Sequence, residues 1–422
     1  MTRLLLIADD FTGSLDTGVQ FAKRGIDTLV TVMRDQPVDL RAACQVLVVN
    51  TESRHATPEE AYRRVASLAA EAAEAGFTHI YKKTDSTLRG NIGSELAAVL
   101  ESVAEDELVF IPAFPKSGRF TIQGNQFVGE TLLAETAFAN DPFNPVRQSS
   151  VAAIIAEQTD LPVDNVFAGQ YDRLKTSTGQ AKTIRVVDAA SDEDLQAIGQ
   201  SLKDAGKLTL LAGCAGFAEW LPALIGLASS MPSMPDVRGG TLIVSGSVNP
   251  MSLKQVQHAF DHCGYASSQL SVDQKIDASH VDTTWENRLI EQLRTGGKVA
   301  IWSKRAETAA DDAAARADQL GIAAEDLASL IAGNIGTIVK RTLDRAAEEA
   351  PIRNLVVFGG DTLLGIADKI GCHLMRPLQE IVPGVVLARF ENCRLALNVI
   401  SKAGGFGGED VVARIDAFLS VK

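Results

Sequence analysis

The polar residues of this chain concentrate in a few short segments, and the densest is Tyr81-Lys-Lys-Thr-Asp-Ser-Thr-Leu-Arg-Gly-Asn-Ile-Gly93. Its two lysines and one arginine suit a carboxylate, its hydroxyl groups suit hydrogen bonding, and Asp85 is a candidate base. Gly90 and Gly93 allow backbone amides to approach a ligand closely. The alternative, a solvated turn, seldom needs so many specialised groups. We therefore interpret this segment as functional.

Two adjacent carboxylates stand near the N-terminus, in Ile7-Ala-Asp-Asp-Phe-Thr-Gly-Ser14. Asp9 and Asp10 could hold a hydroxylated ligand or a metal, and their closeness would raise one pKa unless a cation or a ligand hydroxyl intervenes. The alternative is an ordinary helix N-cap, in which Asp10 or Thr12 accepts the first amides. Arg54 follows another apolar run and is a further candidate for contact with an anion.

Three segments of small residues in the second half of the chain suit phosphate groups. They are Leu242-Ile-Val-Ser-Gly-Ser-Val-Asn-Pro-Met251, Phe358-Gly-Gly-Asp-Thr-Leu-Leu-Gly365 and Ser401-Lys-Ala-Gly-Gly-Phe-Gly-Gly408. Small residues at the start of a helix let phosphate oxygens reach backbone amides. For the first segment, a serine-capped helix with Pro250 in its first turn is the alternative. The two glycine-rich segments lack the P-loop spacing and the G-x-G-x-x-G pattern, yet as a pair they favour a nucleotide site.

The elements around these segments alternate between short apolar runs and amphipathic stretches, which predicts βα units with mainly parallel sheets. Because ligands bind at the carboxyl ends of parallel strands, the position of the polar segments after strands supports a functional interpretation. The expected strands are 4–8, 28–32, 46–49, 79–82, 108–111, 183–187, 208–211, 241–244, 299–302, 355–358, 385–390 and 395–399. The expected helices are 13–23, 58–75, 92–103, 192–203, 250–262, 311–319, 327–349, 363–370 and 410–419.

Length and composition predict two globular domains. A chain of 422 residues with 46% hydrophobic and 22% charged residues suits two packed cores. Prolines and glycines cluster in Met231–Gly240 and predict a linker. We therefore expect a domain over residues 1–232, a linker over 233–240 and a second domain over 241–422. Segment 115–180 has weak periodicity, and its organisation stays open.

Charge and cysteine content narrow the class of protein. A formal net charge of −13 argues against non-specific binding to nucleic acid. The apolar run Leu4–Ala8 is too short for a signal peptide, and no run suits a membrane span, so we expect a cytoplasmic protein. The five cysteines, at positions 44, 214, 263, 372 and 393, fit reduced, buried thiols better than a disulfide or zinc framework.

The polar segments together resemble those of the four-carbon acid sugar kinase family. The resemblance rests on Ala8-Asp-Asp-Phe-Thr-Gly13, Lys82-Lys-Thr-Asp-Ser-Thr-Leu-Arg-Gly-Asn-Ile-Gly93, Ser245-Gly-Ser247, Gly359-Gly-Asp-Thr362 and Lys402-Ala-Gly-Gly-Phe-Gly407, in this order over nearly the whole chain. It implies two Rossmann-like domains, the first binding a sugar acid and the second ATP. The second and fourth segments are more similar to the threonate kinase branch than to the 3-oxo-tetronate branch, so D-threonate is the expected substrate and 4-phospho-D-threonate the expected product. L-threonate, D-erythronate and 3-oxo-tetronate are the alternatives.

The resemblance also implies site residues. Those expected to contact the sugar acid are Asp9, Asp10, Arg54, Lys83, Thr84, Asp85, Ser86 and Arg89, and those expected to contact ATP are Ser245, Ser247, Gly359, Gly360, Asp361, Thr362, Gly404 and Gly405. Phosphoryl transfer needs an aligned hydroxyl and neutralised charge. We expect Lys83, Arg89 and Arg54 to bind the carboxylate, Asp9 or Asp85 to act as the base, and Mg²⁺ to bridge the phosphates, with its protein ligands left open.

Two other function classes compete with a kinase. A non-catalytic sugar-acid sensor would need no nucleotide loops, and the two glycine-rich segments speak against it. A nicotinamide-dependent oxidoreductase would need a dinucleotide fingerprint after an N-terminal strand, where this chain carries Asp9 and Asp10 instead. We expect no nucleic-acid or membrane partner, and a homodimer is the default expectation for the assembly.

Overall fold

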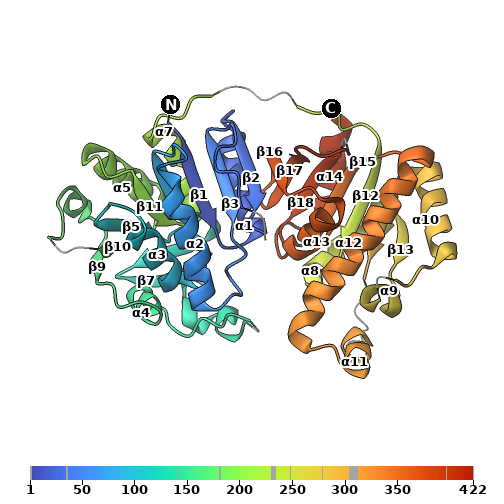
Figure 1. Cartoon of the computed structure of the whole chain (residues 1–422), viewed down its shortest axis with the longest axis horizontal. Coiled ribbons are helices and arrows are strands. Elements are labelled where there is room, and N and C mark those ends of the chain that lie inside the picture. Colours follow the sequence, from blue (N-terminus) through green and yellow to red (C-terminus); the bar gives the residue numbers. More distant parts are fainter. Residues whose placement is uncertain are drawn as a thin grey trace. The chain divides into compact units, whose positions relative to one another are not determined.

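The computed structural model describes residues 2–34, 37–141, 143–179, 182–229, 234–247, 249–277, 279–303, 312–395 and 397–421. The chain divides into two compact units, Met1–Met231 and Pro232–Lys422 (Figure 1). The predicted two-domain α/β class is confirmed. The expected linker, 233–240, begins at a residue outside the described part, and its last residue, Gly240, opens a strand. Its role as a linker stays a prediction.

The N-terminal unit is built on a parallel sheet with the order β2-β3-β1-β4-β11-β5-β10-β9. The central strand β1 is buried at every position, as expected when helices cover both faces of a parallel sheet. The strands are β1 (Leu4–Ala8), β2 (Thr28–Val32), β3 (Val46–Asn50), β4 (His79–Lys83), β5 (Glu107–Ile111), β9 (Val163–Val166), β10 (Thr183–Val187) and β11 (Leu210–Gly213).

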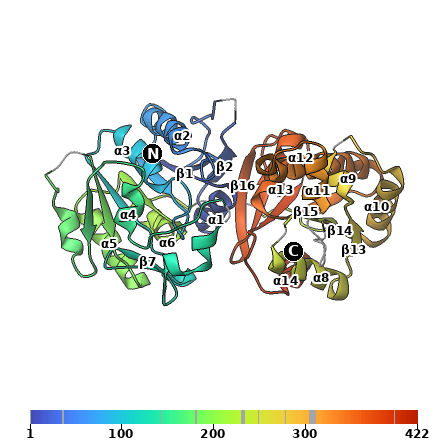
Figure 2. The same ribbon diagram turned by 90° about the horizontal axis from the view of Figure 1, so that it is seen from below.

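Helices cover both faces of this sheet. In Figure 2, α2 and α3 lie on one side of the strands, and α5 and α6 lie on the other. The predicted start of α2 is confirmed, since the Thr57 side chain accepts a hydrogen bond from the Glu60 amide and Pro58 opens the first turn. The helices are α1 (Phe11–Ala22), α2 (Pro58–Ala72), α3 (Ile92–Glu101), α4 (Val151–Ala156), α5 (Asp192–Asp204), α6 (Ala215–Ala218) and α7 (Leu221–Leu224).

The segment whose organisation the sequence left open contains a small antiparallel sheet. Its strands are β6 (Arg119–Ile122), β7 (Asn125–Val128) and β8 (Thr131–Leu132). The described part of the segment also contains helix α4, strand β9 and four 3-10 turns, Pro115–Ser117, Leu133–Glu135, Ala137–Asn140 and Tyr171–Lys175. Strands this short and half-buried leave little periodicity to detect in a sequence.

The C-terminal unit has a mixed sheet with the order β13-β14-β12-β15-β18-β17-β16. Strands β13, β14, β12, β15 and β18 run parallel, whereas β17 is antiparallel to both β16 and β18. The strands are β12 (Gly240–Ser245), β13 (Ala266–Gln269), β14 (Lys298–Trp302), β15 (Ile352–Phe358), β16 (Leu374–Val382), β17 (Val385–Phe390) and β18 (Asn398–Lys402).

Helices again lie on both faces, with α12 and α13 on one side and α8 and α14 on the other (Figure 2). The core under α8 and α14 is apolar and includes Ile243, Val356, Ile400 and Ile415. The helices are α8 (Pro250–His262), α9 (Val272–Ile276), α10 (Thr283–Gly296), α11 (Asp312–Gln319), α12 (Ala324–Glu349), α13 (Gly360–Ile370) and α14 (Val411–Val421). No helix in the described part combines the length and the apolarity that a bilayer span requires.

Some expectations from the sequence were wrong. The strand expected at 395–399 is Asn398–Lys402, and the strand expected at 208–211 is Leu210–Gly213. Cys372 and Cys393 form a disulfide, which contradicts the expectation of five reduced thiols, because the fold brings together two cysteines 21 residues apart. Cys44 and Cys214 are buried free thiols, as expected, and Cys263 is a free thiol that is only partly buried.

Candidate active site

The strand register brings the loops after four strands of the N-terminal unit to the same edge of the sheet, and three of these loops are polar. Ala8 at the end of β1 pairs with Asn50 of β3 on one side and with Lys83 of β4 on the other. Lys83 in turn pairs with Gly213 of β11. The loops that follow these strands therefore begin side by side at the carboxyl edge of the sheet, where ligands bind in folds of this type.

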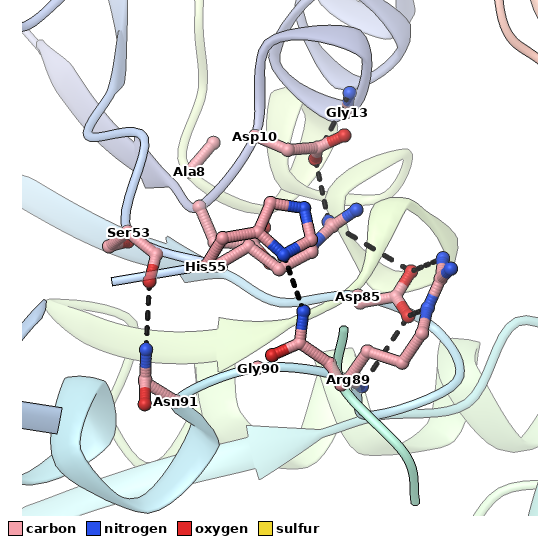
Figure 3. Close-up of polar contacts among 12 residues, drawn as sticks. Ala8, Asp10, Gly13, Ser53, His55, Asp85, Arg89, Gly90 and Asn91 are labelled. Carbon is pink, nitrogen blue, oxygen red and sulfur yellow. Dashed lines mark hydrogen bonds and ion pairs between the residues drawn. The ribbon is translucent and has the colours of Figure 1, made fainter. Parts of the chain in front are cut away.

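Arg54 connects the carboxylates of this edge, two of which, Asp10 and Asp85, are labelled in Figure 3. Its Nε lies 2.7 Å from Asp9 Oδ2, and its Nη2 lies 2.7 Å from Asp10 Oδ1 and 3.9 Å from Asp85 Oδ1. Asp10 also accepts a hydrogen bond from the Gly13 amide, so it is the N-cap of α1 as well as a partner of Arg54. The two interpretations of Asp10 are therefore compatible.

Lys83 approaches the same carboxylates from β4. Its Nζ lies 3.6 Å from Asp10 Oδ1 and 3.8 Å from Asp9 Oδ1. A side chain on Gly13 would collide with this arrangement, because a Cβ there would stand 2.2 Å from Lys83 Nζ and 2.4 Å from Asp10 Oδ1. Gly13 therefore makes room for the ammonium group at the start of α1.

Asp85 is held tightly by its own loop. Arg89 grips both of its oxygens, with Nε 2.7 Å from Oδ2 and Nη2 3.3 Å from Oδ1, and the Thr87 hydroxyl also donates to Oδ2. The third guanidinium nitrogen of Arg89, Nη1, lies 3.2 Å from Asp141 Oδ2. Gly90 has a φ of 90°, which favours glycine, and a Cβ there would stand 3.0 Å from Arg54 Cγ.

The charges of the cluster shift the carboxylate pKa values downward. Burial raises the pKa of Asp9, but Arg54 and Lys83 outweigh it and hold this pKa at about 2. Burial also raises the pKa of Asp85, but Arg54 and Arg89 outweigh it and bring this pKa well below the usual range. Both carboxylates are therefore ionised at neutral pH. The pKa of Lys83 is raised, because Asp10 and Asp9 outweigh the effect of burial.

Thr84 and Ser86 complete the set predicted from the sequence. Thr84 is fully buried, and its hydroxyl has no hydrogen-bond partner within the described residues. Ser86 is half-buried, and its carbonyl accepts a hydrogen bond of 3.0 Å from Gln126 Nε2. The structure thus brings together all the N-terminal residues that the sequence proposed.

Sequence reasoning missed the buried network behind the cluster. Lys82 Nζ lies 2.8 Å from Glu95 Oε2, and both side chains are almost fully buried. Lys82 also donates to the Lys83 carbonyl, and the Ser53 hydroxyl donates to Glu95. Glu95 is the sole acid within the apolar stretch Ile92–Leu100, a signal that could have identified it. Asp141 lies in segment 115–180, where no comparable signal exists.

In the C-terminal unit, the small-residue loops also lie close together. A Cβ on Gly246, after β12, would stand 2.6 Å from Thr362 Oγ1 in the first turn of α13. Gln255 of α8 donates hydrogen bonds to the carbonyls of Phe406, Gly407 and Gly408. The cap of α8 is Asn249 rather than a serine, with Pro250 at the first helical position.

The predicted nucleotide residues lie on these loops. Ser245 ends β12 and Ser247 follows two positions later, where its hydroxyl accepts from the Asn249 amide. Gly359 has a φ of 102°, and Gly360, Asp361 and Thr362 form the first turn of α13. Gly404 and Gly405 follow β18, and no atom would crowd a Cβ on Gly404. The loop is therefore open at that point.

One further residue of this unit was not predicted. Lys402 is fully buried, its Nζ donates to the Gly404 carbonyl and to the Ser252 hydroxyl, and it lies over the Phe358 ring. Burial lowers the pKa of Lys402 to about 8. The described part of the chain offers it no carboxylate at ion-pair distance. Lys402 thus places a cation under the third loop.

The comparisons with known proteins assign these two units. Residues 4–221 match the family model of a sugar-binding N-terminal domain, and residues 242–412 match that of a nucleotide-binding C-terminal domain. A D-threonate kinase from Salmonella typhimurium is 31% identical, with 97% of this chain and 96% of that protein covered. The chain belongs to the four-carbon acid sugar kinase family.

Other relatives of this sugar-acid kinase carry different substrate names. A D-erythronate kinase from Heliobacterium modesticaldum is 30% identical over 100% of this chain and 98% of its own length. A 3-oxo-tetronate kinase from Pseudomonas fluorescens is 28% identical, with 97% of this chain and 95% of that protein covered. Two solved structures share the fold. One, from Salmonella typhimurium LT2, has a TM-score of 0.76 and 24% identity, with 98% of this chain and 99% of that one covered. The other, from Haemophilus influenzae, has a TM-score of 0.73 and 23% identity, with 98% of this chain and 100% of that one covered. The predicted kinase class is thereby confirmed, and the kinase names of the relatives imply the use of ATP.

Proposed function

We propose that this kinase phosphorylates D-threonate with ATP and forms 4-phospho-D-threonate. D-threonate kinases are among its relatives, at 31% and 29% identity. The segments Lys82–Gly90 and Gly359–Thr362 also resemble the threonate branch. D-erythronate is the second candidate, because a relative of that name is 30% identical over the whole chain.

The observation that carries the proposal is the charged cluster at the carboxyl edge of the N-terminal sheet. Arg54, Lys83 and Arg89 lie among Asp9, Asp10 and Asp85 within ion-pair distances. Such a set can bind hydroxyl groups through its carboxylates and a carboxylate through its cations. A polyhydroxylated acid is the small ligand that uses both kinds of group.

Asp9 suits the role of base better than Asp85. Both oxygens of Asp85 are already engaged by Arg89, and Thr87 adds a third donor. Asp9 accepts a hydrogen bond from Arg54 through Oδ2 alone, whereas its Oδ1 is buried, lies 3.8 Å from Lys83 Nζ and has no hydrogen-bond partner within the described residues. A substrate hydroxyl can fill that vacant acceptor and be oriented for attack. We infer that Asp9 orients the hydroxyl and accepts its proton, while Asp85 shapes the loop.

The nucleotide is proposed to bind the loops that contain Ser245, Ser247, Gly359–Thr362 and Gly404–Gly405. Backbone amides at the start of α13 suit phosphate oxygens. Within the described residues no three His, Cys, Asp or Glu side chains gather as a metal site. Mg²⁺ commonly binds through one or two side chains and the phosphates of the nucleotide, and the exposed Asp361 carboxylate fits that role. Mg²⁺ would neutralise charge on the phosphates.

An activity panel tests the proposal directly. The protein is incubated with ATP, Mg²⁺ and one of D-threonate, L-threonate, D-erythronate or 3-oxo-tetronate, and the release of ADP is followed. We expect the highest kcat/KM with D-threonate. A higher kcat/KM with D-erythronate would make D-erythronate the proposed substrate, and the absence of ADP with all four acids would contradict the proposed function.

A cytoplasmic location and a homodimeric assembly remain predictions.

Two single substitutions test the assignment of the base. We expect Asp9→Asn to lower kcat by about 10²–10⁴-fold, since a positioned base contributes that much in typical enzymes. Asp85→Asn should mainly raise KM, because it loosens Arg89 and its loop. Steady-state kinetics at pH 7 separate the two effects. A loss of less than about tenfold in kcat for Asp9→Asn would take the base role from Asp9.

A further inference from the structure

The cations proposed above for the substrate carboxylate are already compensated by the protein. Arg54 has Asp9 and Asp10 as partners, Lys83 has the same two, and Arg89 has Asp85 and Asp141. A substrate carboxylate placed next to these cations would also meet the four carboxylates that surround them. Like charges that close repel, so a cation without a carboxylate partner would bind the substrate carboxylate more strongly than the paired cations of the cluster do.

Arg119, at the start of β6, is such a cation. In the described part of the chain, no carboxylate lies within ion-pair distance of its guanidinium. Its Nη1 donates to the Ser117 carbonyl, whereas its Nε is buried and has no hydrogen-bond partner among the described residues. A buried donor without a partner costs free energy unless a ligand or water satisfies it. The side chain as a whole is only half-buried, which leaves room for a ligand to reach it.

The topology places Arg119 at the same edge of the sheet as the cluster. The edge continues from Lys83 through Gly213 of β11 to Ile111 of β5. The chain leaving β5 reaches Phe114, which pairs with Arg119 through two backbone hydrogen bonds of 2.8 and 3.0 Å. Arg119 therefore approaches the loop of β4 from the side opposite to Arg54, which follows β3.

The small antiparallel sheet is also attached to the substrate loop itself. Gln126 of β7 is fully buried and donates to the Ser86 carbonyl at 3.0 Å, while the Thr121 hydroxyl of β6 donates to Gln126 at 2.8 Å. The position of β6 is thereby fixed relative to Ser86. The charge of Asp85 acts on Arg119, where it opposes the lowering of the Arg119 pKa by burial. An arginine stays protonated at neutral pH in either case.

From this geometry we infer that Arg119 binds the carboxylate of the sugar acid and determines the preference for acids over neutral polyols. The inference rests on the proposed function and deepens it. It divides the site between two ends: Asp9 at β1 orients the hydroxyl, and Arg119 beyond β5 holds the carboxylate. Adjacent strands are about 4.8 Å apart, so β1 and β5 are separated by about 14 Å, a distance that the arginine side chain and the four-carbon acid have to span together.

The test compares an acid with its uncharged analogue. Wild-type protein, Arg119→Met and Arg119→Lys are assayed for ADP release with D-threonate and with D-threonamide. Exposed Arg147, from the same segment, supplies the matched control Arg147→Met. We expect Arg119→Met to lower kcat/KM for D-threonate about 10- to 100-fold, mainly through KM, and to change that for D-threonamide less than about threefold. Arg119→Lys should be intermediate, since it keeps the charge but loses the planar fork.

An equal loss with both substrates would show that Arg119 only supports the fold, and it would overturn the inference. Absence of ADP with every four-carbon acid in wild-type protein would instead overturn the proposed function. Calorimetric titration with D-threonate then decides the inference by itself. Weaker binding to Arg119→Met than to Arg147→Met supports it, whereas equal affinity, or no binding by either variant, overturns it.

Discussion

Two glycines of the N-terminal unit exclude a side chain for different reasons. At Gly13 a Cβ would meet the mobile ends of Lys83 and Asp10, whereas at Gly93 it would stand 2.3 Å from the backbone carbonyl oxygen of Ile155. Side-chain ends can move aside, but a packed backbone cannot do so cheaply. The first glycine therefore preserves the charge arrangement of the site, and the second preserves the packing of α3 against α4.

Substitution by alanine separates the two roles. We expect Gly13→Ala to retain most of its stability and to lose about 10²-fold in kcat/KM, because displacements of about 1 Å in a site have that effect. Gly93→Ala should instead lower the free energy of unfolding by about 1–3 kcal/mol. Urea unfolding and steady-state kinetics measure both. Gly296→Ala, at a position with open space, is the control. Full activity in Gly13→Ala would contradict the proposed site.

Lys402 gives a prediction about pH. Its pKa in the folded protein is about 8, below its ordinary value of 10.5, so the unfolded chain binds more protons between these pH values. Stability attributable to Lys402 should therefore rise as the pH increases from about 8 toward 10, by on the order of 2 kcal/mol.

The measurement is the difference in unfolding free energy between wild-type protein and Lys402→Met, obtained by urea titration at several pH values from 7 to 10. We expect this difference to shift in favour of wild-type protein as the pH rises. Lys369→Met replaces an exposed lysine of α13 and should show no such trend. A difference independent of pH would indicate that Lys402 is not desolvated.

At the scale of elements, the βα units were predicted from the sequence, whereas strand β16 and the small antiparallel sheet of β6 to β8 were not. Strands such as Leu4–Ala8 have continuous apolar runs, and helices such as Pro58–Ala72 have clear caps, so local signals were sufficient. Strand β16 was not predicted because Pro377 lies within it, and its pairing register with β17 shifts between Pro377 and Gln379. The segment with β6 to β8 escaped because its strands are short and half-buried.

The same division applies to the site. Asp9, Asp10 and Lys83 were identifiable, because polar residues directly after a buried strand stand out. Arg119 was not, since its place beside the cluster depends on a small sheet whose pairing is not encoded in any periodicity. Whether a cation is already paired with a carboxylate likewise depends on residues that become neighbours only in the folded chain. A sequence shows which cations exist, but not which ones are already paired.

The disulfide links two elements of the C-terminal unit, the end of α13 and the turn between β17 and β18. We expect the double variant Cys372→Ser/Cys393→Ser to lose about 3 kcal/mol of unfolding free energy, as for a closed loop of this length. Denatured protein should show three reactive thiols before reduction and five afterwards. Cys263→Ser, at a free thiol, is the control. Five thiols without reductant would contradict the disulfide.

At the scale of the whole molecule, each unit carries the groups for a different ligand. The charged cluster suits a sugar acid and contains only residues of Met1–Met231, whereas the glycine-rich loops suit phosphates and lie within Pro232–Lys422. Phosphoryl transfer requires both ligands at once. Binding of either ligand alone, however, should depend only on its own unit.

Binary binding experiments on the full chain test this division. Gly246→Ala would place a Cβ 2.6 Å from Thr362 Oγ1 and 3.0 Å from Ile335 Cδ1, and overpacking of this kind should weaken ADP binding about tenfold or more. The same variant should bind D-threonate with unchanged affinity, and Gly13→Ala should show the reverse pattern. Calorimetry with each ligand alone measures both, and turnover should fall in both variants. If Gly246→Ala weakened D-threonate binding as much as ADP binding, the two ligands would not belong to separate units, and the assignment of the loops would be contradicted.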